Sequence, residues 1–490
     1  MLAVMVTAPS PLQDPYLADR LESPPGWAVV VRHEAHVLDR LRRGECDGLL
    51  PDDWLAPDDL LHFALDGGAL DVFATLPDHR QRRSIPAPLL GKVLLAGTLP
   101  DRRSLSQIGV TVFQSAVILD QLGFNFYYTR EGGPRTGDAR PFDVEALGDF
   151  LAALAPTDYT THATTLAAWL RSQPELTGTT WALDCVDVRL PKGRVPQGQT
   201  AETLHLKVAV LSVLTPDGAL PLLWRFGTPQ DGDITLARPL WDDAVRLWGA
   251  GACRTLLVDA GFLDGPWLAQ VHGQGTTVLT RLRDTMDPLV AARAYVAAHP
   301  ALPWETVPAP KRPAGHERPV RREIVGLTDW PGWDAFGQDL ALCLVCDTYA
   351  DGHTDLWGLM STDPGMAAPT LYATFAQRWQ LEETFMALAR YHLCNALPAS
   401  RIGVACARVH ALLFAYTVRV LCQARQREQQ AATAGRPWRR RTTDLILYAG
   451  GEFGIFKPSV VLEVILTHAD VWRARQAEIL AAVRYCEGSG

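Results

Sequence analysis

The sequence lacks the features of an exported protein. Its first residues, Met-Leu-Ala-Val-Met-Val, run directly into Pro9 and Pro11, without the basic stretch and long apolar segment of a signal peptide. Nine cysteines are scattered along the 490 residues without a secretory disulfide framework. In a reducing compartment such cysteines act as small buried hydrophobic residues. We therefore predict a cytoplasmic protein.

A zinc-binding motif is also missing. Cys343 and Cys346 have C-x-x-C spacing, but neither a second pair nor suitably spaced histidines accompany them. A structural zinc site normally requires four such ligands. The two cysteines lie in an apolar run typical of a buried strand, which predicts a structural role for both thiols.

The sequence has no long apolar run without charges. The longest apolar stretch, residues 404–422, contains Arg408, His410 and Arg419. A membrane-spanning helix rarely tolerates arginines at such positions. The stretch is predicted to be a core helix of a large soluble protein, and no membrane association is expected.

Basic residues are not in excess, because the formal net charge is −8. That value at first argues against a nucleic-acid partner, but binding depends on local fields. Residues 371–450 contain eleven arginines against four acidic residues. The densest run contains Arg436, Arg439, Arg440 and Arg441. Such a run is either a solvated loop or a phosphate-binding segment.

Length and hydrophobic periodicity divide the chain into segments. A chain of 490 residues predicts two to four structural units. Apolar residues three and four apart predict a helical domain over residues 1–170, which suits a DNA-end reader or any helical accessory domain. A meander of strands followed by helix–strand alternation predicts an α/β domain with a mixed sheet, made of residues 171–281 and 366–425. Residues 282–365 are expected to form a β-rich insertion, and residues 426–490 a helical region.

Two aspartates lie beside predicted buried strands. Asp184 follows an apolar segment, and Asp259 ends the run Thr255-Leu-Leu-Val258 shortly before Gly261, which permits a sharp turn. Groups at strand ends in an α/β sheet face the crevice where ligands bind. Buried carboxylates need a partner, and a metal ion is a natural one. The alternative is that both aspartates are turn or capping residues.

A third acidic residue follows the insertion. Arg378 and Glu382 are four residues apart in a predicted helix, so both lie on one helical face. Trp379 and Phe385 would anchor other parts of that helix to the core. Taken alone, the pair is equally well explained as a surface ion pair on an amphipathic helix.

Together these residues resemble the DDE transposases of bacterial insertion sequences, in the group with a Tyr-x2-Arg-x3-Glu-x6-Lys signature. Arg378-Trp-Gln-Leu-Glu382-Glu-Thr-Phe385 is similar to that group's Arg-Trp-x-Ile-Glu-x-x-Phe. Leu257-Val-Asp259-Ala-Gly-Phe262 resembles its second-aspartate motif, and Leu183-Asp184 resembles the first. Gly227-Thr-Pro-Gln-Asp231 resembles a Gly-Asn-x-x-Asp loop between them. The resemblance covers residues 85–420 and includes the long insertion before the third carboxylate.

The sequence departs from the signature at two positions. The signature tyrosine falls on Phe375, and the lysine falls on Ala389, with Arg390 one residue later. In the family these side chains are thought to hold the DNA backbone near the cut, so the departures put the activity of this copy in doubt. The first aspartate is either Asp184 or Asp187, and Asp184 matches the motif better.

The resemblance implies an RNase H-like core that works with two Mg²⁺ or Mn²⁺ ions. Two such ions about 4 Å apart can activate a water and stabilise the leaving 3′-oxygen. The family pattern implies that Asp184 bridges the ions, with Asp259 and Glu382 each completing one site. Arg378 would bind a phosphate or orient Glu382. The freed 3′-hydroxyl would then attack target DNA.

The implied partners are the terminal inverted repeats of the element and target DNA. The residues expected to contact DNA are Arg378, Arg390, Arg436, Arg439, Arg440 and Arg441. Synapsis of two ends predicts a homodimer on DNA, associated with the nucleoid in a bacterial cytoplasm. Two alternatives stay open. One is a metal-dependent nuclease on the same core that cuts without joining, and the other is a catalytically silent DNA-binding relative.

Overall fold

The chain folds as two compact units. Tyr159–Ala396 form one, and Met1–Asp158 together with Leu397–Gly490 form the other. The computed structural model describes residues 29–32, 34–46, 48–51, 58–81, 85–99, 104–113, 116–124, 127–129, 133–135, 143–189, 205–216, 218–308, 319–390, 401–432, 445–449 and 452–473. Each unit contains its own sheet and its own helices, so they are described in turn.

The unit Tyr159–Ala396 is built on a nine-stranded mixed sheet. Its strands are β5 (Thr180–Arg189), β6 (His205–Thr215), β7 (Gly218–Gly227), β8 (Thr255–Val258), β9 (Thr277–Arg281), β10 (Glu305–Thr306), β11 (Arg321–Trp330), β12 (Leu340–Thr348) and β13 (Thr354–Ser361). They are ordered β10-β11-β12-β13-β9-β8-β5-β6-β7. Only the β5–β8 and β8–β9 pairs are parallel, and the other neighbours are antiparallel.

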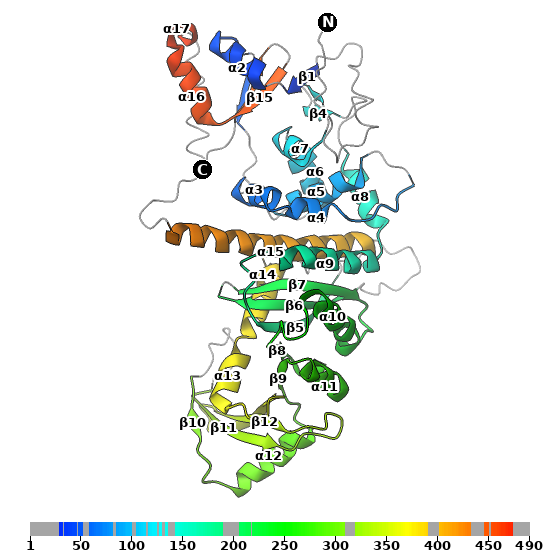
Figure 1. Ribbon diagram of the computed structural model, residues 1–490, viewed down its shortest axis with the longest axis vertical. Helices are drawn as coiled ribbons and strands as arrows, with labels where there is room; N and C mark the ends of the chain where they lie inside the picture. Colours follow the sequence, from blue (N-terminus) through cyan, green and yellow to red (C-terminus); the bar gives the residue numbers. More distant parts are fainter. Residues whose placement is uncertain are drawn as a thin grey trace. The chain divides into compact units, whose positions relative to one another are not determined.

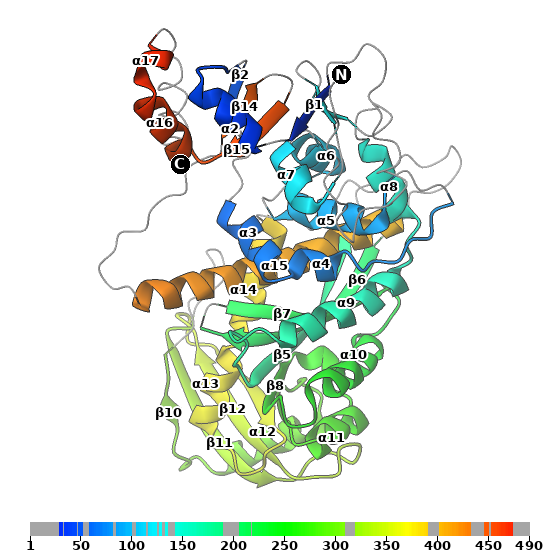
Figure 2. The ribbon, with the colours of Figure 1, turned by 45° about the horizontal axis from the view of Figure 1, so that its top comes forward.

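Helices cover both faces of this sheet. Figures 1 and 2 show α10 (Asp233–Trp248), α11 (Gly265–Gly273) and α12 (Asp287–Ala298) against one face. They show α13 (Ala368–Ala376) and α14 (Trp379–Arg390) against the other. α14 packs on β5, β6 and β7, and α13 packs on β9 and β11–β13. The predicted α/β class with a mixed sheet is thus confirmed.

The strands follow the predicted segments closely. The meander β5–β7 and the short strand β8 lie where apolar runs predicted them, because strands buried on both faces read as continuous apolar segments. The helix predicted across 375–385 is interrupted instead. α13 ends at Ala376 and α14 begins at Trp379, so Arg378 stands at the junction between two helices.

Residues 282–365 do not form a separate sheet. β13 pairs antiparallel with β9, with Leu359 opposite Arg281, so β10–β13 extend the same sheet that carries β5. An exposed edge of β9 would leave backbone N–H and C=O groups unpaired, and the insertion covers it. The predicted insertion therefore continues the sheet at its β9 edge.

The other unit combines a helical core with a smaller sheet. Its helices are α2 (Glu34–Arg42), α3 (Asp58–Asp66), α4 (Ala69–Phe73), α5 (Ala87–Thr98), α6 (Leu105–Phe113), α7 (Ala116–Leu122), α8 (Val144–Ala152), α15 (Ile402–Ala432), α16 (Pro458–Thr467) and α17 (Ala469–Trp472). α7 ends at the predicted stop, where Gly123 has φ 90°. The boundary between the units falls within α9 (Pro156–Arg171).

α15 belongs to the helical unit and not, as predicted, to the α/β core. It packs on α3, α5 and α8, and its Phe414 stacks on Phe73 of α4 with ring centroids 5.7 Å apart. Ile402–Arg425 is long and apolar enough to cross a membrane, and 89% of its apolar window is buried inside the protein. That burial is typical of a core helix.

Strands, and not only helices, occur near both ends of the chain. β1 (Val29–Arg32), β2 (Gly48–Pro51), β3 (Tyr127–Thr129), β4 (Gly133–Arg135), β14 (Leu445–Ala449) and β15 (Glu452–Phe456) form a sheet ordered β2-β14-β15-β1-β3-β4. The region 426–490, predicted to be helical, thus contains a hairpin. Its strands pair with β2 and β1, roughly four hundred residues away in the sequence, and local periodicity carries no information about such partners.

Candidate functional site

Asp184 lies on β5, the strand between β6 and β8. Residues Ala182, Leu257 and Leu279 are register partners across β5, β8 and β9 and belong to one apolar cluster beneath α13 and α14. Because side chains alternate along a strand, Asp184 faces the same side as Ala182. Its Oδ1 accepts a hydrogen bond from Cys185 N at 2.8 Å.

Asp259 stands immediately after β8. Leu183 pairs with Val258 in parallel register, so the next residues, Asp184 and Asp259, lie side by side, Asp184 within β5 and Asp259 just beyond the carboxyl end of β8. Asp259 caps a short 3₁₀ turn, Ala260–Phe262, and its Oδ1 accepts from Gly261 N at 2.7 Å. Its second carboxylate oxygen is not used by that bond.

Arg378 joins the third predicted carboxylate to the first. Its Nη1 lies 3.4 Å from Asp184 Oδ2, and its Nη2 donates to Glu382 Oε1. The side chains of Asp184 and Arg378 are only 18% and 19% exposed, whereas Glu382 is 35% exposed. The Phe375 ring lies 5.8 Å from the guanidinium carbon and so packs against the arginine.

The carboxylates influence one another electrically. The pKa of Asp184 is raised to about 6, mainly by burial and also by the charges of Asp259 and Glu382, against the lowering effect of Arg378. Desolvation disfavours a carboxylate's charged form, and neighbouring anions do the same. Arg378 forms ion pairs with two of the three carboxylates, Asp184 and Glu382.

The donor set suits a hard divalent cation, since all three groups offer carboxylate oxygens and Arg378 forms ion pairs with only two of them. The positions of these side chains in this structure are less suited to a cation. Within the described part of the chain, no three His, Cys, Asp or Glu side chains are grouped closely enough to hold a metal ion. Arg378 bonds to Asp184 and Glu382, so loading a metal requires these side chains to turn away from the arginine.

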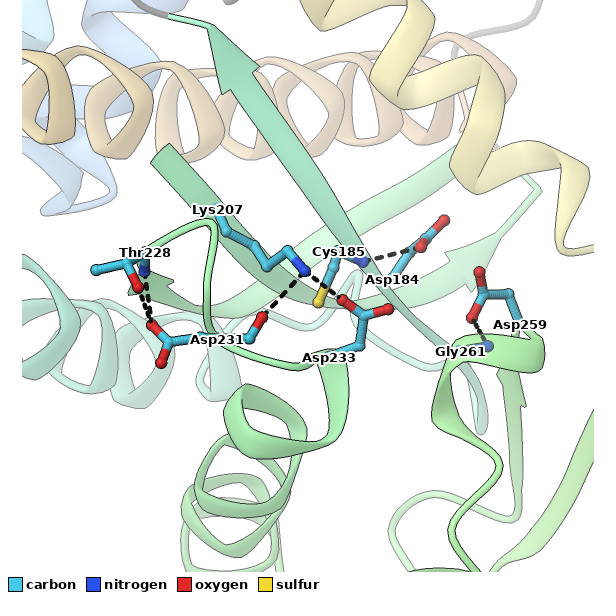
Figure 3. Close-up of polar contacts among 8 residues, drawn as sticks. All are labelled: Asp184, Cys185, Lys207, Thr228, Asp231, Asp233, Asp259 and Gly261. Atoms are coloured by element: carbon cyan, nitrogen blue, oxygen red, sulfur yellow. Dashed lines mark hydrogen bonds and ion pairs between the residues drawn. The ribbon is translucent and has the colours of Figure 1, made fainter. Parts of the chain in front are cut away.

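A second polar cluster lies behind the first, on the opposite face of β5. In Figure 3 Asp184 and Asp259 lie on one side of β5, and Cys185 and Lys207 lie on the other. Lys207 Nζ donates to Asp233 Oδ1 at 2.8 Å and to the Asp231 carbonyl at 3.1 Å. These bonds hold the start of α10 against β6.

Asp187 belongs to this second cluster. It is exposed and stands directly opposite Lys207 in the β5–β6 register. It lies three positions after Asp184, an odd offset, which places the two side chains on opposite faces of the strand. Of the two aspartates considered for the first position, only Asp184 faces Arg378.

The two clusters meet at Gly261. A Cβ at this position would come within 2.6 Å of Asp233 Oδ2 and 2.8 Å of Asp259 Oδ1. Asp233 and Lys207 were not singled out in the sequence. The available signal was weak: an acidic residue at the first position of α10, and a lysine in an otherwise apolar strand.

The other predicted residues contribute less to this site. Arg390 is the last residue of α14, and its side chain, like that of Ala389, lies outside the described residues. The same is true of Arg436, Arg439, Arg440 and Arg441.

The C-x-x-C pair does not form a metal site. Cys343 lies in the apolar cluster beneath α13, and Cys346, three residues further along β12, faces the opposite side of the strand. Burial raises the pKa of both thiols. Both are free cysteines, so the predicted structural role fits their positions.

Comparison with known proteins adds no relative. No family model matches the chain, and no curated protein matches its sequence.

Proposed function

We propose that this protein is a DDE-type DNA transposase that cuts at the ends of its insertion sequence and joins them to target DNA. The observation that supports this most directly is the link between Asp184, Arg378 and Glu382, with Asp259 beside Asp184 on the neighbouring strand. Asp184 from β5, Asp259 from the end of β8 and Glu382 from α14 thereby come from distant parts of the sequence to one place on the sheet. Capping residues or a surface ion pair would not need to converge in this way.

The sheet supports an RNase H-like core as part of this proposal. Strands β7-β6-β5-β8-β9 form a run in which β5 is central, with an antiparallel meander on one side and two parallel strands on the other. Ligand sites in such sheets form beyond the carboxyl ends of the parallel strands. Asp259 follows β8 at that edge.

In the proposed mechanism, Asp184, Asp259 and Glu382 would together hold two Mg²⁺ or Mn²⁺ ions. When bound, the ions supply an activated water and stabilise the leaving 3′-oxygen. Arg378 neutralises two of the carboxylates before the ions arrive. Its planar guanidinium also matches a phosphate, so it is suited to hold the DNA strand once Glu382 has turned away.

The proposal extends to partners and place. The DNA substrates would be the terminal inverted repeats and the target, and a homodimer would form on DNA in the bacterial cytoplasm. Phe375 has no donor for a phosphate, and it packs against Arg378 instead. Contacts to the DNA backbone near the cut must therefore come from residues other than Phe375, which occupies the tyrosine position of the signature.

Cleavage of a labelled duplex covering the DNA that flanks the coding sequence tests the proposal. Native protein should cut at the element boundary with Mg²⁺ or Mn²⁺ and not with EDTA. Glu382→Gln should reduce the rate by about a thousandfold or more, as expected for loss of a group that acts at the reacting centre. The matched control is Glu383→Gln, because Glu383 is exposed on the same helix and its carboxylate accepts a hydrogen bond from Trp379 Nε1 at 3.0 Å.

The outcomes separate three functions. Cutting followed by strand joining indicates a transposase, and cutting without joining indicates a nuclease on the same core. If the native protein binds the ends but never cuts, the protein is a silent DNA-binding relative and the proposed activity is wrong.

A further inference from the structure

Arg281 lies on the same face of the sheet as the three carboxylates, at the carboxyl end of the parallel strands. It is the last residue of β9 and follows Leu279 by two positions, as Asp259 follows Leu257. Leu257 and Leu279 are partners in parallel register. Side-chain alternation therefore places Arg281 on the strand next to Asp259, facing the same side. Two strand spacings, roughly 10 Å, separate its backbone from that of Asp184.

No carboxylate neutralises the charge of Arg281 among the described residues. Its side chain is exposed. Arg322, on the same face of the sheet, behaves in the opposite way. It is 3% exposed and forms two bonds to Asp347, from Nε at 2.5 Å and from Nη2 at 2.6 Å. One arginine on this face is neutralised by a buried acid, and the other is left facing solvent.

Arg281 is nevertheless held in place by an aromatic ring. Its guanidinium carbon lies 5.1 Å from the ring centroid of Trp357, a distance typical of a cation–π contact. Trp357 is itself fixed, because its Nε1 donates to Asp347 Oδ2 at 3.1 Å and Arg322 packs against the same ring at 5.4 Å. The buried Arg322–Asp347 pair thus orients the ring on which Arg281 rests.

The carboxylates create a need for such a cation. Asp184, Asp259 and Glu382 together repel a DNA phosphate, and Arg378 offsets only part of that charge. A planar guanidinium already oriented by stacking loses little conformational freedom when it binds a phosphate. β8, which Asp259 follows, lies between β9 and β5. Arg281 on β9 is therefore on the opposite side of Asp259 from Asp184, the β5 residue that contacts Arg378.

We propose that Arg281, oriented by Trp357, binds a phosphate of the DNA strand held at the carboxylates. The inference rests on the proposed function and adds a substrate contact to it. It supplies a phosphate ligand in a chain whose signature tyrosine and lysine positions hold Phe375 and Ala389. Arg281 is thus a DNA-binding residue and takes no part in bond breaking.

The test is the affinity and salt dependence of DNA binding in full-length protein. The probe is a fluorescein-labelled duplex covering the flanking DNA, titrated by anisotropy in Ca²⁺ over a range of salt concentrations. Arg281→Gln should weaken binding by roughly tenfold and lower the slope of log K against log salt by about one, as the loss of one phosphate contact predicts. Arg281→Lys should keep the slope and recover part of the affinity, because the charge remains and the planar fork is lost.

The matched control is Arg254→Gln. Arg254 is exposed and directly precedes β8, at the edge of the sheet opposite Asp259, so the same charge change should leave affinity within about twofold of native. The inference is overturned if Arg281→Gln also binds within twofold with an unchanged slope while the native protein still cuts. Binding that depends on Arg281 without any cutting keeps the inference and removes the proposed activity. If native protein binds no DNA, both are wrong.

Discussion

The charged form of the Asp184 carboxylate is energetically unfavourable because the side chain is mostly buried. Its pKa of about 6, raised mainly by burial, means that the folded protein holds a proton on this group more tightly than the unfolded chain does. Above about pH 6 the group is charged in both states, and the folded state bears the full penalty. The penalty fades as the pH falls toward the ordinary value of 3.8, because protonation then relieves the folded state. Such a residue destabilises the fold and is understandable where a ligand needs the charge.

Asp184→Asn is therefore expected to stabilise the metal-free protein at neutral pH. The shift of roughly two pH units sets a ceiling of about 3 kcal/mol on the gain. Urea unfolding in EDTA, at about pH 7.5 and about pH 4.5, measures it. The gain should be largest at the higher pH and shrink at the lower one. A variant that is less stable than native at the higher pH would show that Asp184 serves the fold.

At the scale of elements, the turn after β8 joins the two polar clusters. Asp259 caps this turn from one side, and Asp233 approaches from the N-terminus of α10. Both carboxylates stand close to Gly261, which leaves no room for a side chain. Lys207 balances the charge of Asp233. The hydrogen bond between the two side chains raises the pKa of the lysine. The position of Asp259 thus depends on β6, β8 and α10, whose polar groups meet at Gly261.

Gly261→Ala should disturb the candidate site more than the fold. The added methyl group would push Asp233 and Asp259 aside, at a cost of about 1–3 kcal/mol typical of overpacking. Binding of Mn²⁺, followed by calorimetry, should weaken along with DNA cleavage. The control is Gly273→Ala in α11, where an added Cβ meets nothing within 4 Å and where alanine favours a helix. Equal Mn²⁺ affinity in both variants would contradict the role given to this turn.

At the scale of the whole molecule, the two ends of the chain build one sheet. β14 lies between β2 and β15, and β15 also pairs with β1. The core beneath includes Val37 and Leu41 from the N-terminal side, and Leu447 and Trp472 from the C-terminal side. Trp472 Nε1 also donates to the Leu41 carbonyl at 3.0 Å. The N-terminal strands therefore cannot complete their sheet until the C-terminus has been synthesised.

Truncation after residue 444 should unfold this small sheet. β1 and β2 would lose their partners and much of their apolar cover, and isolated short strands are not stable in water. Residues 29–51 should become accessible to limited proteolysis and lose amide protection from hydrogen exchange. Protection of β5–β9 should be unchanged, because that sheet contains no strand from the C-terminus. Unchanged protection of 29–51 would contradict the pairing described here.

The sequence by itself determined the central α/β sheet, because buried strands such as β6 and β8 are apolar runs bounded by turn residues and need no distant partner to be recognised. The motif order also indicated Asp184, Asp259 and Glu382. Only the tertiary structure decided which strands the insertion would join, that residues 445–456 would pair with the N-terminus, and that α15 would pack in the helical unit. Pairing and packing partners are chosen between distant segments, which local periodicity does not encode. For the same reason only the tertiary structure placed Arg281 on the strand next to Asp259, and Asp233 and Lys207 behind the carboxylates on the other face of β5.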